Sequence, residues 1–421
     1  MKKMGLICFV TLMLISMVTK AQENKVKFKL SGFVEAETFW DSRKNVSTRD
    51  GAIMLYPKNK MLDANGNDLN DHSDFFMTAA MSRLRATVSG FNAFGAKGVA
   101  VLEADFAGTA DDKTGLLRLR HAFVKLDWAN DQLIVGKYWH PMFVVSAFPR
   151  VLHTGGGIPF GVLNRAPQVR FTHKLSDKTS VNFAVLSEMD FKSTGPDGAN
   201  VKYAQQAGVP EFSLQAKTKI NAFELGATVG FKTLMPLTET IVKDAEGKKI
   251  RGIKTDERIS SFHSNAWLAY TASKFKWNVQ AIYGQNMYNF VCLGGYGVKN
   301  VKDNGDYEYT NMSTMSLTSD IYTTTGNLRY ALNAGYTKNL GAADDLATNA
   351  DGFVGLYSRG ADIDYMYQVA PRIELYSGKM LFGAEAVYTA AAYGDTQIDG
   401  TVNNTDIVGS TRLIFHVRYS F

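Results

Sequence analysis

Long segments of this chain alternate between apolar and polar residues. From Val26 to Trp40, the even-numbered positions are almost all apolar, whereas most odd-numbered positions are charged or polar. A period of two places the two sets on opposite faces of a β-strand. The pattern recurs along the chain in segments of about 9 to 13 residues, and no segment after the first 21 residues has 18 consecutive apolar residues. The sequence therefore predicts an all-β chain of long strands without a transmembrane helix.

The strand lengths favour a transmembrane barrel over a soluble sheet. Strands of about 9–11 residues cross a bilayer when tilted, whereas strands of soluble proteins average about 5–6 residues. A soluble β-sandwich or β-helix also alternates, and is the alternative. Short turns alternate with long polar or Gly-rich segments, as in bacterial outer-membrane barrels with short periplasmic turns and long extracellular loops. The long segments are 41–78, 190–208, 233–260, 286–311, 338–360 and 393–405.

We predict sixteen antiparallel strands, an even number as expected for a single-chain bacterial barrel. Their expected ranges are 26–40, 79–91, 97–107, 116–128, 132–139, 167–175, 180–188, 209–220, 223–232, 261–271, 275–285, 313–323, 327–337, 361–376, 379–392 and 406–421. In the fourth strand the alternation changes phase, which predicts a bulge near His121. A barrel of this size encloses an aqueous channel.

The first 21 residues have the pattern of a secretory signal peptide. Lys2 and Lys3 precede an apolar run from Leu6 to Val18, and small residues follow before an expected cleavage near Ala21. We therefore expect residues 1–21 to be a signal peptide and 22–421 to be one barrel domain. The whole chain has a formal net charge of +6, and no concentrated basic face points to a nucleic-acid partner.

Motifs of catalysis or metal binding are missing from the sequence. It has no G-x-S-x-G or H-E-x-x-H, its seven histidines show no ligand spacing, and Cys292 is the one cysteine after the signal segment. We expect no enzyme activity, no cofactor and no metal. An outer-membrane barrel hydrolase, or a structural or adhesive barrel with a plugged lumen, is the alternative function.

The last strand carries a further signal. Leu413, Phe415, Val417, Tyr419 and Phe421 form its apolar face, and a terminal Phe on such a strand resembles the assembly signal of Gram-negative outer-membrane barrels. Four segments resemble the trimeric porins of the DcaP-like family: "GFVEAETFWD", "LLRLRHAFVKL", "GKYWHPMF" and "APRIELYSGKMLFGAEAVYTAAAYG". This resemblance implies a sixteen-stranded homotrimer in the outer membrane of a Gram-negative bacterium, contacting lipid and passing small hydrophilic, often anionic solutes.

The segment 139–166, after the fifth strand, is the expected constriction loop. It is rich in apolar residues and contains the triplet Gly155–Gly157, but it has no acidic residue. A loop surrounded by water would be polar, so this one is expected to fold against the rest of the protein. In sixteen-stranded porins, the loop after the fifth strand folds into the lumen and narrows it. The alternatives are that it plugs the barrel or packs at a subunit interface.

Basic side chains of inward parity, together with those of the loop, are the candidate pore-lining residues. They are Arg83, Arg85, Arg118, Arg120, Arg150, His153, Arg165, Arg170, Arg372 and Arg412. A ladder of charge inside a water-filled pore selects which ions enter, and the planar guanidinium suits carboxylates. The alternative is that these arginines pair with inward acids such as Glu103 and Glu374 and only brace the wall. A surplus of unpaired basic residues near Arg150 and Arg165 would give the pore a preference for anions such as small carboxylates.

Overall fold

A computed structural model describes residues 26–243, 246 and 249–421. The expected signal peptide, 1–21, lies outside the described residues. Among those residues, no helix is long and apolar enough to cross a membrane.

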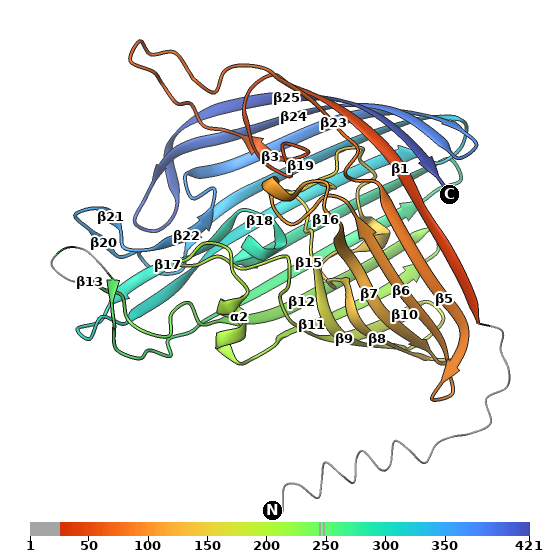
Figure 1. The fold of residues 1–421 in the computed structure, drawn as a ribbon, viewed down its shortest axis with the longest axis horizontal. Coiled ribbons are helices and arrows are strands. Elements are labelled where there is room, and N and C mark those ends of the chain that lie inside the picture. Colours follow the sequence, from red (N-terminus) through yellow and green to blue (C-terminus); the bar gives the residue numbers. More distant parts are fainter. Residues whose placement is uncertain (1–25, 244–245, 247–248) are drawn as a thin grey trace, which may run out of the picture.

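The described chain forms a closed antiparallel barrel of sixteen strands (Figure 1). The barrel closes where β1 pairs with β25 along one edge and with β5 along the other. The barrel strands are β1 Lys27–Asp41, β5 Arg83–Ala93, β6 Ala96–Asp105, β7 Arg118–Asp127, β8 Asp131–Trp139, β9 Arg165–Lys174, β10 Thr179–Leu186, β11 Glu211–Ile220, β12 Phe223–Leu234, β15 Ile259–Thr271, β16 Phe275–Gln285, β18 Tyr307–Thr323, β19 Leu328–Ala342, β23 Ile363–Ser377, β24 Met380–Thr396 and β25 Val402–Ser420. The predicted fold class and strand number are confirmed.

Shorter elements lie in the connections. The strands are β2 Asn45–Thr48, β3 Ile53–Pro57, β4 Asp74–Thr78, β13 Val242–Lys243, β14 Lys249–Ile250, β17 Gly294–Val301, β20 Thr348–Asn349, β21 Gly352–Phe353 and β22 Leu356–Arg359. The helices are η1 Asp111–Lys113, η2 Val145–Ala147, α2 Lys202–Ala207 and η3 Met287–Phe290. β4 pairs with β1 beyond β5, so β4 and β5 together follow the whole length of β1.

The local details of the strands agree with the alternation in most places. Glu103 pairs with His121 and Ala104 pairs with Leu119, so Arg120 is an extra residue in its strand and forms the expected bulge. The connection between β24 and β25 differs from the expected long loop at 393–405. β24 continues to Thr396 and β25 begins at Val402, so only residues 397–401 connect the two strands. The backbone ladder there overrides the polar composition that indicated a loop.

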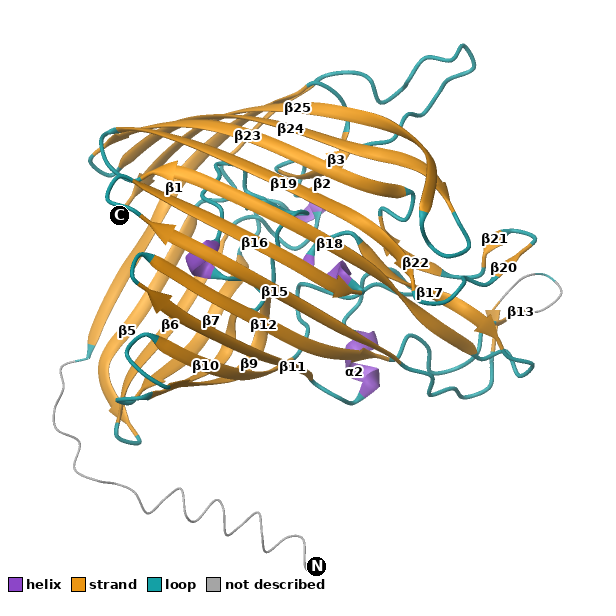
Figure 2. Ribbon diagram, turned by 180° about the vertical axis from the view of Figure 1, so that it is seen from behind, coloured by secondary structure: helices purple, strands orange, loops and turns teal. Residues whose placement is uncertain are grey.

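The outer face of the barrel is apolar and the inner face is polar. Val34, Leu214 and Phe415 are 60%, 52% and 61% exposed, and each lies on the outward face of its strand. Polar residues of the inner face, such as Thr228 and Asn278, are almost completely buried because segments of the chain fill part of the lumen. Figure 2 shows these loops and short helices inside the ring of strands.

Two of the described segments that reach into the lumen position the site. One is the loop 140–164, as expected from the sequence. The other is the hairpin β2–β3, which lies in the segment expected to be a polar loop. All five residues of β3, Ile53–Pro57, are buried, and the hairpin packs with Ile158, Phe160 and wall residues of β23–β25 in one apolar cluster. Its apolar sequence, "IMLYP", was the available signal for this location.

Candidate pore constriction

The loop 140–164 lies against one side of the inner wall. It begins directly after β8 and ends directly before β9, and the His140 N–H donates to the Asn164 carbonyl at 3.1 Å. The first part of the loop presents carbonyl oxygens to the wall. Those of Pro141, Met142 and Ala147 accept hydrogen bonds from side-chain amides. The donors are Gln215 on β11 at 2.7 Å, Asn265 on β15 at 2.8 Å and Gln280 on β16 at 2.8 Å.

The second part of the loop presents donors instead. Asp320 on β18 accepts the Arg150 N–H at 2.9 Å. Glu385 on β24 accepts the N–H groups of Leu152 at 3.0 Å and His153 at 2.8 Å. The hydroxyl of Thr154 donates to Glu37 on β1 at 3.1 Å.

The wall therefore offers amides to loop carbonyls and carboxylates to loop N–H groups. These partners fix the path of the loop from β11 around to β1. Sequence reasoning missed this role for Asp320 and the wall amides, because inward polar residues occur on every strand of a barrel.

The space left in the lumen lies between the loop and the opposite wall. It has a volume of about 990 Å³ and reaches the inner faces of β1, β5 and β7, the tip of β2–β3 and the segment 189–192. Among the described residues, ten basic side chains line it: Arg49, Arg83, Arg118, Arg120, Arg150, Arg165, Lys192, Lys276, Arg359 and Arg418. Only two acidic side chains, Glu35 and Asp190, do so. The lining is therefore strongly basic.

A second cavity of about 550 Å³ lies toward the short turns. It is lined by residues of the turns 128–130 and 175–178, and it shares Trp139, Phe143 and Val145 with the larger cavity. Arg170 lines this second space. The two cavities therefore lie side by side along the loop.

The arginines of β5 and β7 are paired with acids of the strand between them. Asp105 accepts two hydrogen bonds from Arg118, at 2.9 and 2.7 Å, and Arg120 bridges Asp105 and Glu103 at 2.8 Å each. On the other side, Arg85 lies 3.2 Å from Glu103 and Arg83 lies 3.7 Å from it. Cross-pairing, which the sequence left as an alternative, thus occurs on this wall.

Two of the candidate arginines lie under the inserted segments. Arg372 is 4% exposed and contacts Glu374 and Glu385, and Arg412 is 1% exposed and donates to Asp41 through two nitrogens at 2.7 Å. Neither lines the cavities just described. These two side chains support the loop and the hairpin instead of facing the open lumen, because the inserted chain covers them.

The loop residues are held in different ways. Arg150 hydrogen-bonds to Tyr376 and lies 3.7 Å from Glu374, and the His153 ring lies 3.0 Å from Glu385. Arg165 is 2% exposed and contacts the rings of Trp139 and Phe191.

A buried cluster fixes the start of the loop. The Nε2 atoms of His140 and His263 lie 2.8 and 3.2 Å from one oxygen of Glu211. These three groups are close enough to surround a metal ion. However, the Nδ1 of His140 accepts the Met142 N–H at 3.1 Å. A neutral His140 must therefore carry its proton on Nε2, where a metal would bind. The geometry fits a hydrogen-bonded anchor better than a metal site.

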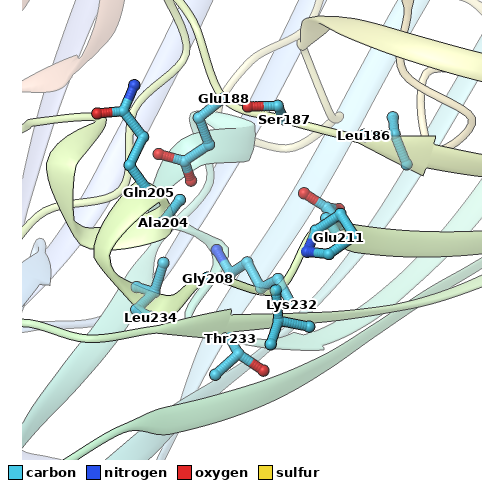
Figure 3. Close-up of a pocket in the computed structure, with 12 residues that line it drawn as sticks. Leu186, Ser187, Glu188, Ala204, Gln205, Gly208, Glu211, Lys232, Thr233 and Leu234 are labelled. Atoms are coloured by element: carbon cyan, nitrogen blue, oxygen red, sulfur yellow. The ribbon is translucent and has the colours of Figure 1, made fainter. Parts of the chain in front are cut away.

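A smaller cavity of about 230 Å³ lies beside this cluster, between α2 and the strands β10–β12 (Figure 3). Glu188 and Lys232 both line it. Burial raises the pKa of Glu188 to about 7, although Ser193 donates two hydrogen bonds to its carboxylate. Lys232 donates to Asn286 and Asn289 of the neighbouring loop. These groups connect the loops around α2 to the wall.

Comparison with known proteins identifies the fold. No protein-family profile matches the chain, and no curated protein sequence matches it. Among solved structures, the outer membrane channel DcaP of Acinetobacter baumannii has a TM-score of 0.68 at 16% identity, covering 96% of this chain and 100% of that one. The anion-selective porin from Comamonas acidovorans has a TM-score of 0.52 at 10% identity, covering 94% and 100%. Salmonella typhi OmpF, solved with daunomycin, has a TM-score of 0.52 at 12% identity, covering 96% and 100%.

These neighbours share the barrel fold with this chain. The fold, together with the apolar outer face, indicates the outer membrane of a Gram-negative bacterium. The structural resemblance to DcaP agrees with the resemblance found in the sequence.

Proposed function

We propose that this protein is an outer-membrane porin through which small hydrophilic solutes diffuse passively, with a preference for anions such as carboxylates. The observation that carries the proposal is the basic lining of the space beside the loop. Among the described residues, ten basic side chains and two acidic ones line it. Charge in a narrow, partly desolvated passage acts on a permeating ion more strongly than charge on an open surface. The cavity-lining residues proposed for this role are Arg83, Arg118, Arg120, Arg150, His153, Arg165 and Arg170. Arg85, which shares the inward face of β5 with Arg83, is proposed to act beside them.

The adjoining cavities support a channel over a plugged barrel. A barrel hydrolase or a structural or adhesive barrel needs no open space along the loop, whereas here two cavities lie side by side along it and share three lining residues. No catalytic motif accompanies them in the sequence, and the proposal includes no enzyme activity, cofactor or metal.

Reversal potential in a salt gradient tests the proposal. The purified protein is inserted in a planar bilayer, and the permeability ratio of chloride to potassium is measured. Anion preference is expected. Ohmic conductance with no preference would contradict the proposed selectivity but support the porin, and the absence of conductance would favour a plugged barrel.

We further propose that the mature protein begins near Gln22 and forms a homotrimer in the lipid of the outer membrane. One solved neighbour, OmpT of Vibrio cholerae, is described in a trimer form, with a TM-score of 0.55 at 10% identity. Closed symmetry is the usual result when a protein packs against copies of itself. Mass measurement in mild detergent without heating tests this, and a monomeric mass would contradict it.

A further inference from the structure

Arg165 differs from Arg118 and Arg120, the other buried guanidinium groups of the larger lumen cavity, because both of those are paired with acids. Arg49 also has no ion pair within the described residues, but it is only partly buried. The arginines of β5 are close to acids as well, and Arg418 donates to Glu35 at 2.8 Å. Arg359 donates to two backbone carbonyls, at 2.9 and 3.0 Å. Within the described residues, no carboxylate oxygen lies within the 4.0 Å ion-pair distance of Arg165, and its Nε has no hydrogen-bond partner.

Aromatic rings take the place of an acid around this group. The guanidinium carbon lies 5.0 Å from the ring centre of Trp139 and 5.2 Å from that of Phe191. Trp139 is the direct cross-strand partner of Arg165, so the two side chains share the inner face. The Trp139 ring is stacked on Phe143 of the loop, with centroids 3.8 Å apart and an angle of 11° between the rings. The tryptophan is therefore fixed, and it restricts the guanidinium in turn.

This cation has no close counter-charge among the described residues. Asp190 and Asp105 act on it from beyond the 4.0 Å ion-pair distance, and each is already paired, with Lys137 and with Arg118, at 2.7 Å. Arg165 is 2% exposed, and buried charges in proteins are normally paired with an opposite charge. Aromatic faces stabilise a cation without neutralising it. The side chain also lines the larger lumen cavity, close to the arginines of β7. An anion entering that cavity would supply the missing partner.

We propose that Arg165 is the contact residue of an anion-binding subsite in the constriction, and that Trp139 and Phe191 are positioning residues that keep its guanidinium free for oxyanions. The ligands are small carboxylate or phosphate groups, which accept paired hydrogen bonds from one guanidinium. This proposal rests on the proposed anion-preferring porin. It assigns most of the selectivity to Arg165 and less to the arginines that are paired with acids.

The test must separate a lost contact from a lost charge. Arg165→Gln and the control Lys174→Gln each remove one positive charge from β9. Lys174 lines the cavity toward the short turns, and its Nζ donates to the Ala129 carbonyl at 3.4 Å. Their effects on the long-range field are therefore similar, whereas only the first removes a group from the proposed subsite.

The experiment measures single-channel conductance against the concentration of inorganic phosphate. Wild type is expected to saturate. Arg165→Gln should raise the half-saturating concentration about tenfold, as expected for the loss of one charge-assisted contact. The control should stay within about twofold of wild type, because it keeps that contact.

Substitutions of the tryptophan test the positioning role. Trp139→Leu removes the aromatic face and should weaken saturation in the same direction as Arg165→Gln. Trp139→Phe keeps an aromatic ring and should restore most of the saturation by phosphate. A purely space-filling role for Trp139 would not predict this recovery. In Trp139→Leu/Arg165→Gln, the effects should not add, because both changes remove the same contact.

The outcomes distinguish this inference from the function on which it rests. A wild-type channel without anion preference would overturn the proposed selectivity. An anion-preferring wild type in which Arg165→Gln and Lys174→Gln shift saturation equally would overturn the subsite alone. Equal saturation of Trp139→Leu and wild type would overturn the positioning role.

Discussion

Glu385 is the wall residue that holds the largest number of groups of the constriction loop. Its Oε2 accepts the N–H of Leu152 at 3.0 Å, the N–H of His153 at 2.8 Å and a contact from Nδ1 of the same histidine at 3.0 Å. Replacing it by glutamine keeps the size of the side chain and removes its charge. We expect Glu385→Gln to release the loop from this part of the wall without unfolding the barrel.

The magnitude follows from the number of contacts. Hydrogen bonds to a charged group contribute about 1.5–3 kcal/mol, and neutral ones contribute about half as much. Weakening three of them should therefore cost about 2–4 kcal/mol of loop docking. Even about 2 kcal/mol changes the ratio of undocked to docked loop by about thirtyfold. Arg372 keeps its contact with Glu374 at 2.8 Å, so the substitution leaves that buried cation paired.

Single-channel recording provides the assay. The variant should spend about thirtyfold more time in a conductance state larger than the main one, because the docked loop narrows the lumen. Thr154→Val, which removes a single hydroxyl contact with Glu37, should give a smaller increase of the same kind. Thr389→Val is the matched control, since Thr389 lies on the same strand but hydrogen-bonds to Gln368 of the wall. Unchanged substates in Glu385→Gln would refute the role of these contacts.

Three other outcomes are expected. Val34→Lys, on the outward face of β1, should destabilise the folded barrel by about 2–4 kcal/mol in urea unfolding in lipid vesicles, and unchanged stability would mean that this residue does not face lipid. Arg150→Glu with Arg165→Glu should move the reversal potential toward cations, whereas Arg251→Glu, whose side chain is 93% exposed, should have far less effect because salt screens it; equal shifts would argue against a constriction at the loop. Burial raises the pKa of Glu188 from 4.5 to about 7, so the folded state binds more protons in that window and stability should fall as pH rises through it. Glu188→Gln should remove this slope from a series of unfolding measurements, and an unaltered slope would assign it to other groups.

The strands could be predicted from the sequence because their pattern is local. Alternation with a period of two assigns each side chain to the lipid face or to the lumen face, whichever strand lies next to it. This determined the sixteen strands, the outward position of Val34 and the bulge beside His121, where the parity of the arginines changed. The apolar, acid-free composition of the segment after β8 likewise indicated a loop that folds against the protein.

The tertiary structure alone decided which charges in the lumen are compensated. Arg118 and Arg165 are the same residue type and both face inward, so the sequence did not distinguish them. Strand register places Asp105 opposite Arg118 but Trp139 opposite Arg165. The covered position of Arg412 was likewise undetermined, because its partners, Asp41 and the carbonyls of Gly51 and Ala52, lie 360 to 371 positions away in the chain. Parity assigns a side chain to a face, whereas its ionic environment depends on pairing between distant segments.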